Sequence, residues 1–275
     1  MDTSLLEHPA VQSGVAPFLF SLIVAGIFYR VSIVSGLAII AGFVISVLLS
    51  TGFAFDPLTS TRKISLIILI APILGVILTL SNRYSKTTLN VFYALGALAM
   101  LWVMWPVLSR SPLNMILPIF GYMVYAAWMV GIFLRLSETT SLSAGVASTA
   151  TGFGIGICAL TGASALLGQM GLSLGAAGAA YLLVQLLSRR DAEAGFTVTL
   201  TSGFMAALIL PAAVVYAKVP WVVLPLIAIV PVIAFYPFED EDTIWKNTIS
   251  LLAVMAIPIG YAIYLTVQSA GEILM

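Results

Sequence analysis

The stretch TGASALLGQMGLSLGAAGAA, residues 161–180, decides between an enzyme-like and a structural interpretation of this chain. Glycine-rich stretches occur in phosphate-binding loops, in flexible linkers and in closely packed helices. A phosphate-binding loop exposes backbone amides ahead of a helix and usually carries a lysine, whereas this stretch contains no charged residue. Its small residues recur at intervals of four and three, which places them on one face of a helix. The spacing therefore predicts a helix-packing surface.

A second face of small residues precedes this one at steps of four. Two such faces let helix backbones approach closely, as in small-xxx-small contacts between membrane helices. Thr161, Gly162 and Ala163 would then form the turn between the two helices. We call the pair of faces the small-residue seam. Its predicted members are Ala144, Ser148, Gly152, Gly156, Ser164, Gly168, Gly171, Gly175 and Gly178.

The composition places this seam in a membrane. Of the 275 residues, 61% are hydrophobic and only 8% are charged, against about 25% charged in soluble domains, and the mean hydropathy is +1.13. Apolar runs about as long as the ~20 residues needed to cross a bilayer recur throughout. We therefore expect an all-α integral membrane protein, a bundle of about ten transmembrane helices forming a single domain over 1–275 in the lipid bilayer. The expected spans are 10–29, 31–53, 64–82, 89–108, 115–135, 141–160, 164–188, 197–217, 219–237 and 245–268.

Ten spans allow two halves of five, 1–138 and 139–275. Short echoes relate the halves: SGVA at 13–16 resembles AGVA 131 residues later, and Trp105-Pro106 has a counterpart at the same interval. Because five spans begin and end on opposite sides of the membrane, a fused second copy would be inverted, as in many secondary transporters. In span number, span length and short loops the layout resembles the drug/metabolite transporter superfamily, although no motif of the chain carries this resemblance.

The distribution of basic residues predicts an orientation. Lys and Arg concentrate in short loops on the cytoplasmic side of membrane proteins. Four lie on the side of the N-terminus and seven on the other, which predicts periplasmic termini in a cytoplasmic (inner) membrane. The two sets are Arg62, Lys63, Arg110 and Lys218, and Arg30, Arg83, Lys86, Arg135, Arg189, Arg190 and Lys246.

Several function classes are disfavoured. The net charge is zero, which gives no electrostatic basis for nucleic-acid binding. Cys158 and His8 are the only residues of their types and lie far apart, so we expect no metal and no cofactor. No Asp or Glu falls inside a predicted span, which leaves an enzyme without a buried general base. The acidic run at 238–242 is interpreted as a solvated loop rather than a cation site.

Two functions remain open. The first is a transporter for a small neutral, amphipathic or lipid-like solute, with a neutral polar site between the fourth, sixth and seventh spans. The second is a non-catalytic membrane subunit or scaffold, which contacts other membrane proteins or copies of itself. The residues expected to bind a solute are polar and lie at depth: Gln169, Ser148, Thr151, Tyr93 and Tyr122. Gln169 is the leading candidate, because its amide donates and accepts hydrogen bonds and small neighbours leave space beside it.

Overall fold

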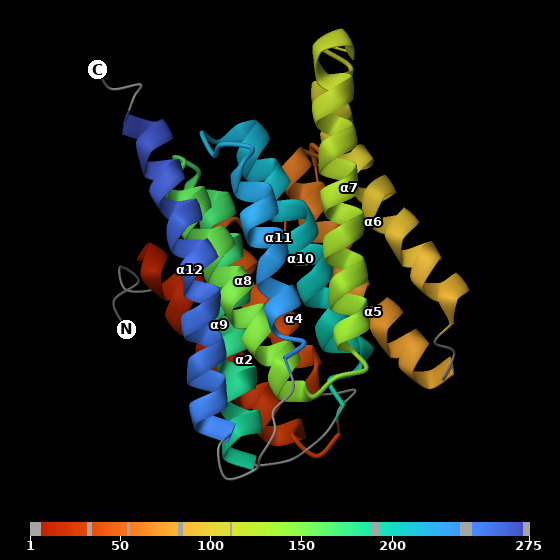
Figure 1. Cartoon of the computed structure of the whole chain (residues 1–275), viewed down its shortest axis with the longest axis vertical. Helices are drawn as coiled ribbons and strands as arrows, with labels where there is room; N and C mark the ends of the chain where they lie inside the picture. The colour runs from red at the N-terminus through yellow and green to blue at the C-terminus, as the bar shows by residue number, and fades with distance from the viewer. Residues whose placement is uncertain are drawn as a thin grey trace.

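The protein is a bundle of helices in the part of the chain that the computed structural model describes. That part comprises residues 7–31, 35–53, 56–81, 85–110, 112–188, 193–236 and 244–271, without the side chains of 112–115. The acidic run at 238–242 lies outside it. The helices, shown in Figure 1, are a π-helical turn η1 (Val11–Val15), α2 (Ala16–Phe28), α4 (Leu37–Ser50), α5 (Ser60–Ser81), α6 (Lys86–Leu108), α7 (Pro112–Leu136), α8 (Ser141–Thr161), α9 (Ala165–Ser188), α10 (Gly195–Tyr216), α11 (Val223–Ile233) and α12 (Ile244–Gly271).

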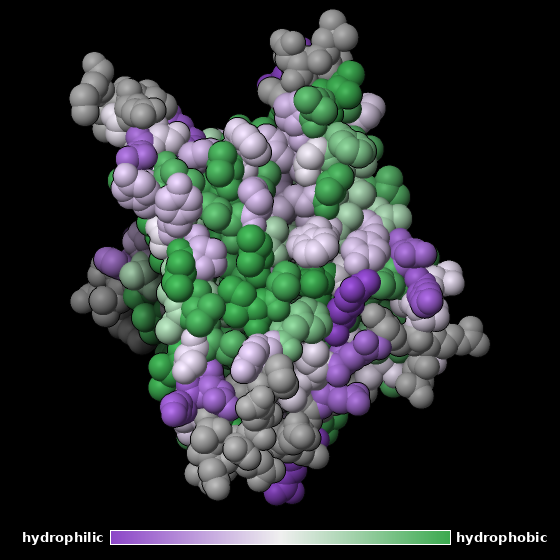
Figure 2. Space-filling model, viewed as in Figure 1, coloured by the Kyte–Doolittle hydropathy of each residue, from purple (hydrophilic) through white to green (hydrophobic). Residues whose placement is uncertain are grey.

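The bundle confirms the predicted membrane-type helical fold. Eight helices in the described part of the chain are long and apolar enough to cross a membrane. Figure 2 shows the corresponding surface, with a hydrophobic band across the middle of the visible face and hydrophilic residues gathered toward its ends. In such a band the outward side chains contact lipid, so exposed apolar residues there need no protein partner.

Two of the predicted spans contain shorter helices than we expected. The span 31–53 contains α4, with 14 residues, and the span 219–237 contains α11, with 11 residues. Two prolines lie in α11, Pro225 in its first turn and Pro231 in its last turn. Because proline lacks a backbone N–H, it interrupts the run of helical hydrogen bonds and favours an early end of the helix.

Three helices form the interior of the bundle. In an apolar 18-residue stretch of α8, α9 and α10, between 78 and 89% of the residues are buried, against at most 39% in the corresponding stretches of the other spanning helices. α9 packs against α8, α2 and α4, while α10 packs against α5, α7 and α8. In Figure 1, α12 lies on one flank of this interior, and α5, α6 and α7 lie on the other.

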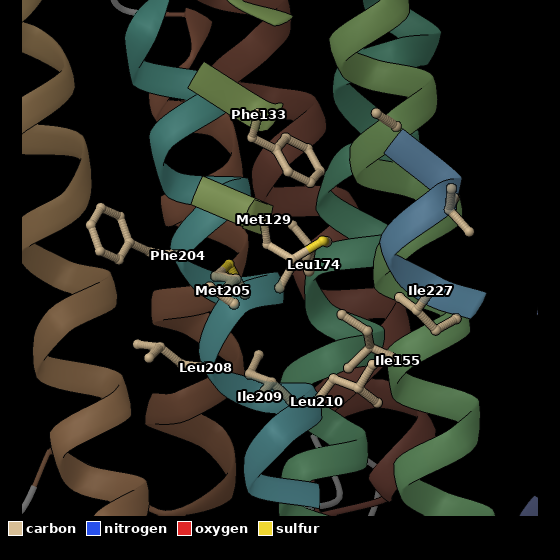
Figure 3. Packing of buried hydrophobic residues seen from close by; sticks show 14 of the residues in the cluster. Met129, Phe133, Ile155, Leu174, Phe204, Met205, Leu208, Ile209, Leu210 and Ile227 are labelled. Atoms are coloured by element: carbon tan, nitrogen blue, oxygen red, sulfur yellow. The ribbon is translucent and has the colours of Figure 1, made fainter. Parts of the chain in front are cut away.

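Side chains from five helices fill the space around α10. Figure 3 shows Met205 and Ile209 of α10 on the side of Met129 and Phe133 of α7, Phe204 on the opposite side of α10, and further residues from α8, α9 and α11. These five side chains are at most 3% exposed. Such close packing of large side chains makes the α10 surroundings a rigid hydrophobic core.

The turn between α8 and α9 closes as a compact helix end. Ala163 has a positive φ of 71°, and the amide of Ser164 donates to the carbonyl oxygen of Ala159 at 2.9 Å. This bond spans five residues, as in a Schellman motif, where the positive-φ position is usually glycine. The amide of Lys218 donates to the carbonyl oxygen of Gly162 at 2.7 Å, which ties the α10–α11 connection to the same turn.

Candidate functional site

The small-residue seam lies along the contact between α8 and α9. A Cβ atom added to Gly152 would lie 2.2 Å from the backbone nitrogen of Gly175, and one added to Gly171 would lie 2.6 Å from the Cα atom of Gly156. Real Cβ atoms do not approach other heavy atoms this closely, so only glycine fits at these positions. The two backbones are therefore in direct contact, as in small-xxx-small packing of membrane helices.

The seam continues toward both ends of this helix pair. A Cβ atom on Gly178 would lie 2.8 Å from the backbone nitrogen of Thr149, and one on Gly168 would lie 2.4 Å from the side chain of Leu160. Ala144 is fully buried beside the start of this contact. Ser164, at the other limit of the predicted stripe, lies in the turn and is half-buried. The contact is long and continuous, which leaves no space for a ligand between α8 and α9.

Two of the five predicted solute-binding residues lie near each other on α8. The Ser148 hydroxyl lies 2.7 Å from the Ser202 hydroxyl of α10 and also donates to the carbonyl oxygen of Ala144 at 2.7 Å. Thr151, one turn further along α8, is fully buried and its hydroxyl has no hydrogen-bond partner. Both side chains therefore lie inside the protein, at the contact between helices rather than on a cavity wall.

The other three predicted residues lie elsewhere. Gln169 is half-buried in the second turn of α9, and its amide makes no hydrogen bond with a described residue. The Tyr93 ring of α6 crosses the α7 backbone at Gly131, where an added Cβ atom would overlap the ring. Tyr122 is half-buried on α7. Because α6 packs against α5, α7 and α10, the structure does not gather the five residues into one site.

A buried polar cluster that the sequence analysis did not single out lies at the end of the bundle where α8 begins. The Tyr181 hydroxyl of α9 hydrogen-bonds with Ser141 and Ser35, and the Ser141 hydroxyl donates to the Gln185 side chain at 3.2 Å. All four residues are buried. The spacing of Tyr181 and Gln185, one helical turn apart on α9, was the available signal. The cluster joins α8, α9 and Ser35, which lies two residues before the start of α4.

A second polar contact stabilises the crossing of α5 and α6. Pro106 of α6 has no N–H to donate to the carbonyl oxygen of Trp102, four residues earlier. The Lys63 ammonium of α5 donates to that oxygen at 3.0 Å and lies 5.2 Å from the centre of the Trp102 ring. The Ser60 hydroxyl donates to the neighbouring carbonyl oxygen of Val103 at 3.0 Å. Two side chains of α5 thus satisfy oxygens beside the α6 proline.

Among the cavities that open between described residues, four have volumes of about 260, 560, 530 and 480 Å³. Their walls come mainly from the ends of the outer helices and from loops. No residue of α8 lines any of the four, while α9 contributes only Leu166 and Met170 and α10 only Tyr216. The polar residues in the middle of α8 therefore face none of these cavities.

The described residues also contain no obvious metal centre, because no three His, Cys, Asp or Glu side chains gather among them. In comparisons with known proteins, no family matches the chain, and no characterised protein is significantly similar to it in sequence.

Proposed function

We propose that this protein is a non-catalytic subunit or scaffold of a larger membrane assembly. The observation that supports this proposal is the close packing of its inner helices, where the α8 and α9 backbones touch along the small-residue seam. A carrier needs a space for its solute and helices that exchange positions around it. Here the four cavities described above lie away from the middle of α8, and the inner hydroxyls of Ser148 and Thr149 bond to their own helix or to Ser202 of α10.

An outward face of α12 is the place where this proposal is best tested. Ala253, Ala256 and Gly260 lie exposed on this helix, and an added Cβ atom on Gly260 would meet nothing within 4 Å. Their spacing resembles that of the small-residue seam, but no helix in the described part of the chain covers them. In the proposed assembly a transmembrane helix of another subunit, or of a second copy, packs here.

The test is purification of the protein in mild detergent, with its mass measured by size-exclusion chromatography and light scattering. We expect a stable complex larger than one chain, which Gly260→Leu weakens by blocking close approach. Gly121→Leu is the matched control, because Gly121 of α7 is also exposed with nothing within 4 Å. A monodisperse single chain, from membranes solubilised under conditions that preserve known complexes, would contradict the proposal.

Transport of a small neutral or lipid-like solute is the second candidate. The observation that favours it is a set of buried hydroxyls without a hydrogen-bond partner among the described residues, which includes those of Thr151 on α8 and Thr197 on α10. Such groups are available to bind a polar group of a solute in a second conformation. A solute screen in proteoliposomes tests this, comparing the wild type with Gln169→Leu and Ser148→Ala. Uptake that neither substitution alters would remove both residues from the proposed site.

The inverted repeat belongs to this second candidate. A two-fold axis between halves 1–138 and 139–275 would pair α4 with α9 and α5 with α10, and both pairs are in contact. The contact of α7 with α6 likewise has its counterpart in the contact of α12 with α11. However, α7 packs extensively against α10, whereas α12 makes no comparable contact with α5, the counterpart of α10, and packs against α8 instead. The two halves therefore make different contacts, and the repeat stays a prediction.

The membrane and orientation are also proposals. We infer a cytoplasmic membrane with periplasmic termini from the four-to-seven distribution of Lys and Arg. A membrane-impermeant thiol reagent tests this in intact cells of a Cys158→Ala background. A cysteine replacing Lys218 would react from outside, and one replacing Lys86 would not. The reverse pattern would invert the topology without affecting the subunit proposal.

A further inference from the structure

The first turns of α5 carry two consecutive cations that the fold uses differently. Lys63 is buried and already donates to the carbonyl oxygen of Trp102. Arg62 faces the cavity of about 260 Å³, and its guanidinium makes a single described hydrogen bond, to the carbonyl oxygen of Pro57 at 2.7 Å. No carboxylate lines that cavity, and Arg62 forms no ion pair with any described residue. Its positive charge is therefore not neutralised by an ion pair within the described part of the chain.

The walls of this cavity divide into a polar and an apolar part. Thr51, Thr59, Thr61 and Ser65 line it together with Arg62, while Val47 of α4 and Leu166 and Met170 of α9 form an apolar wall. The Thr51 and Ser65 hydroxyls already donate to backbone carbonyl oxygens. The Thr59 and Thr61 hydroxyls lie 3.1 Å apart and share one hydrogen bond. One of the two consequently keeps a proton to donate to a ligand.

We propose that this cavity binds a phosphate ester whose apolar part lies toward α4 and α9. Arginine binds phosphate with parallel hydrogen bonds, because its planar guanidinium presents several N–H groups. The Pro57 bond fixes the guanidinium and leaves other N–H groups unused. The volume fits a head group rather than a whole lipid, since pockets for drug-sized ligands begin at roughly 300 Å³. This chemistry is found in an anionic phospholipid of the surrounding membrane and in a soluble phosphate ester.

The test is binding to the full-length protein, delipidated in detergent, measured by native mass spectrometry with three probes: phosphatidic acid, phosphatidylcholine and glycerol phosphate. We expect the wild type to bind phosphatidic acid at least fivefold more tightly than phosphatidylcholine. Arg62→Gln should reduce this preference to less than twofold. Arg110→Gln is the matched control, because Arg110 is exposed and lines a different cavity.

Two further variants keep the test decisive if Arg62→Gln is poorly folded. Arg62→Lys keeps the charge but loses the paired hydrogen bonds, and Thr61→Val keeps the shape but loses a hydroxyl. Each should lower the preference two- to threefold. Displacement of phosphatidic acid by glycerol phosphate identifies the phosphate ester alone as sufficient, and its failure identifies the lipid as the ligand. An unchanged preference in Arg62→Gln, or an equal loss in Arg110→Gln, overturns the proposal without affecting the subunit proposal.

Discussion

The helix pairs α8–α9 and α5–α6 are both formed by neighbouring helices, but they meet in opposite ways. Along α8–α9 the backbones touch through glycines, and an added Cβ atom on Gly152 would lie 2.2 Å from the neighbouring nitrogen. Between α5 and α6 the described contacts include long polar side chains that reach across, with Lys63 donating to the Trp102 carbonyl oxygen. The first contact depends on the absence of side-chain volume. The second depends on a side chain that donates to the carbonyl oxygen that Pro106 leaves without its helical partner.

The largest expected effect comes from adding volume to the first contact. Gly152→Leu would force α8 and α9 apart, because the new side chain has only backbone atoms of Leu174 and Gly175 to displace. We expect a loss of at least about 3 kcal/mol of unfolding free energy, at the upper end of the range for overpacked cores. Unfolding by titration with denaturing detergent measures this change.

The matched control for this prediction is Gly26→Leu on α2. Gly26 is exposed and has nothing within 4 Å of an added Cβ atom. Replacing a helical glycine there should leave stability equal or raise it by up to about 1 kcal/mol, because glycine is the weaker helix former. A similar loss in both variants would show that the effect comes from the substitution and not from the seam.

The second contact should break when its donor is removed. Lys63→Met keeps most of the apolar stem but leaves the Trp102 carbonyl oxygen without its donor. An unsatisfied polar group of this kind costs about 1–3 kcal/mol. Pro106→Ala restores an N–H that can donate to the same oxygen, so Lys63→Met should cost less in that background.

A double-mutant cycle isolates this coupling. We expect an interaction energy of about 1 kcal/mol between positions 63 and 106, within the range for residues in one hydrogen-bond network. The comparison uses unfolding free energies of the wild type, both single variants and the double variant. Additive effects, within about 0.4 kcal/mol, would mean that Lys63 does not substitute for the missing proline N–H.

The same two helix pairs show what the sequence predicts and what it does not. Spacing alone predicted the seam stripes, because glycines at steps of three and four have few other uses in a membrane helix. It did not predict that Lys63 satisfies the carbonyl oxygen of Trp102. That contact joins residues 39 positions apart on two different helices. The helical repeat relates only residues of the same helix, so it cannot predict such a pair.

The candidate solute site was less predictable for a related reason. Periodicity places Ser148 and Thr151 on one side of α8, but the position of Gln169 or Tyr93 relative to them depends on how helices pack. Hydropathy carries little of that information in a chain so uniformly apolar. Depth in the membrane was therefore a poor guide to whether a polar residue lines a cavity, meets another helix or bonds within its own.

A smaller effect is expected at the contact between α8 and α10. Ser148→Ala removes the hydroxyl that lies 2.7 Å from that of Ser202. Hydrogen bonds between membrane helices average about 0.6 kcal/mol, and we expect a loss of that order. Ser202→Ala should cost the same, and the double variant should cost little more than either single one. Full additivity would show that the two hydroxyls act independently.

The smallest effect is expected at Thr151, although this residue is as buried as Ser148. Its hydroxyl has no hydrogen-bond partner in the structure, so replacing it by a methyl group removes an unsatisfied polar group and keeps the shape. Thr151→Val should therefore leave the unfolding free energy unchanged or raise it by up to about 1 kcal/mol. Thr149→Val is the control, because the Thr149 hydroxyl donates to the carbonyl oxygen of Gly145 at 2.7 Å. A clear loss of stability in Thr151→Val would show that its hydroxyl binds something in the membrane, such as water or a solute, and would strengthen transport over the subunit proposal.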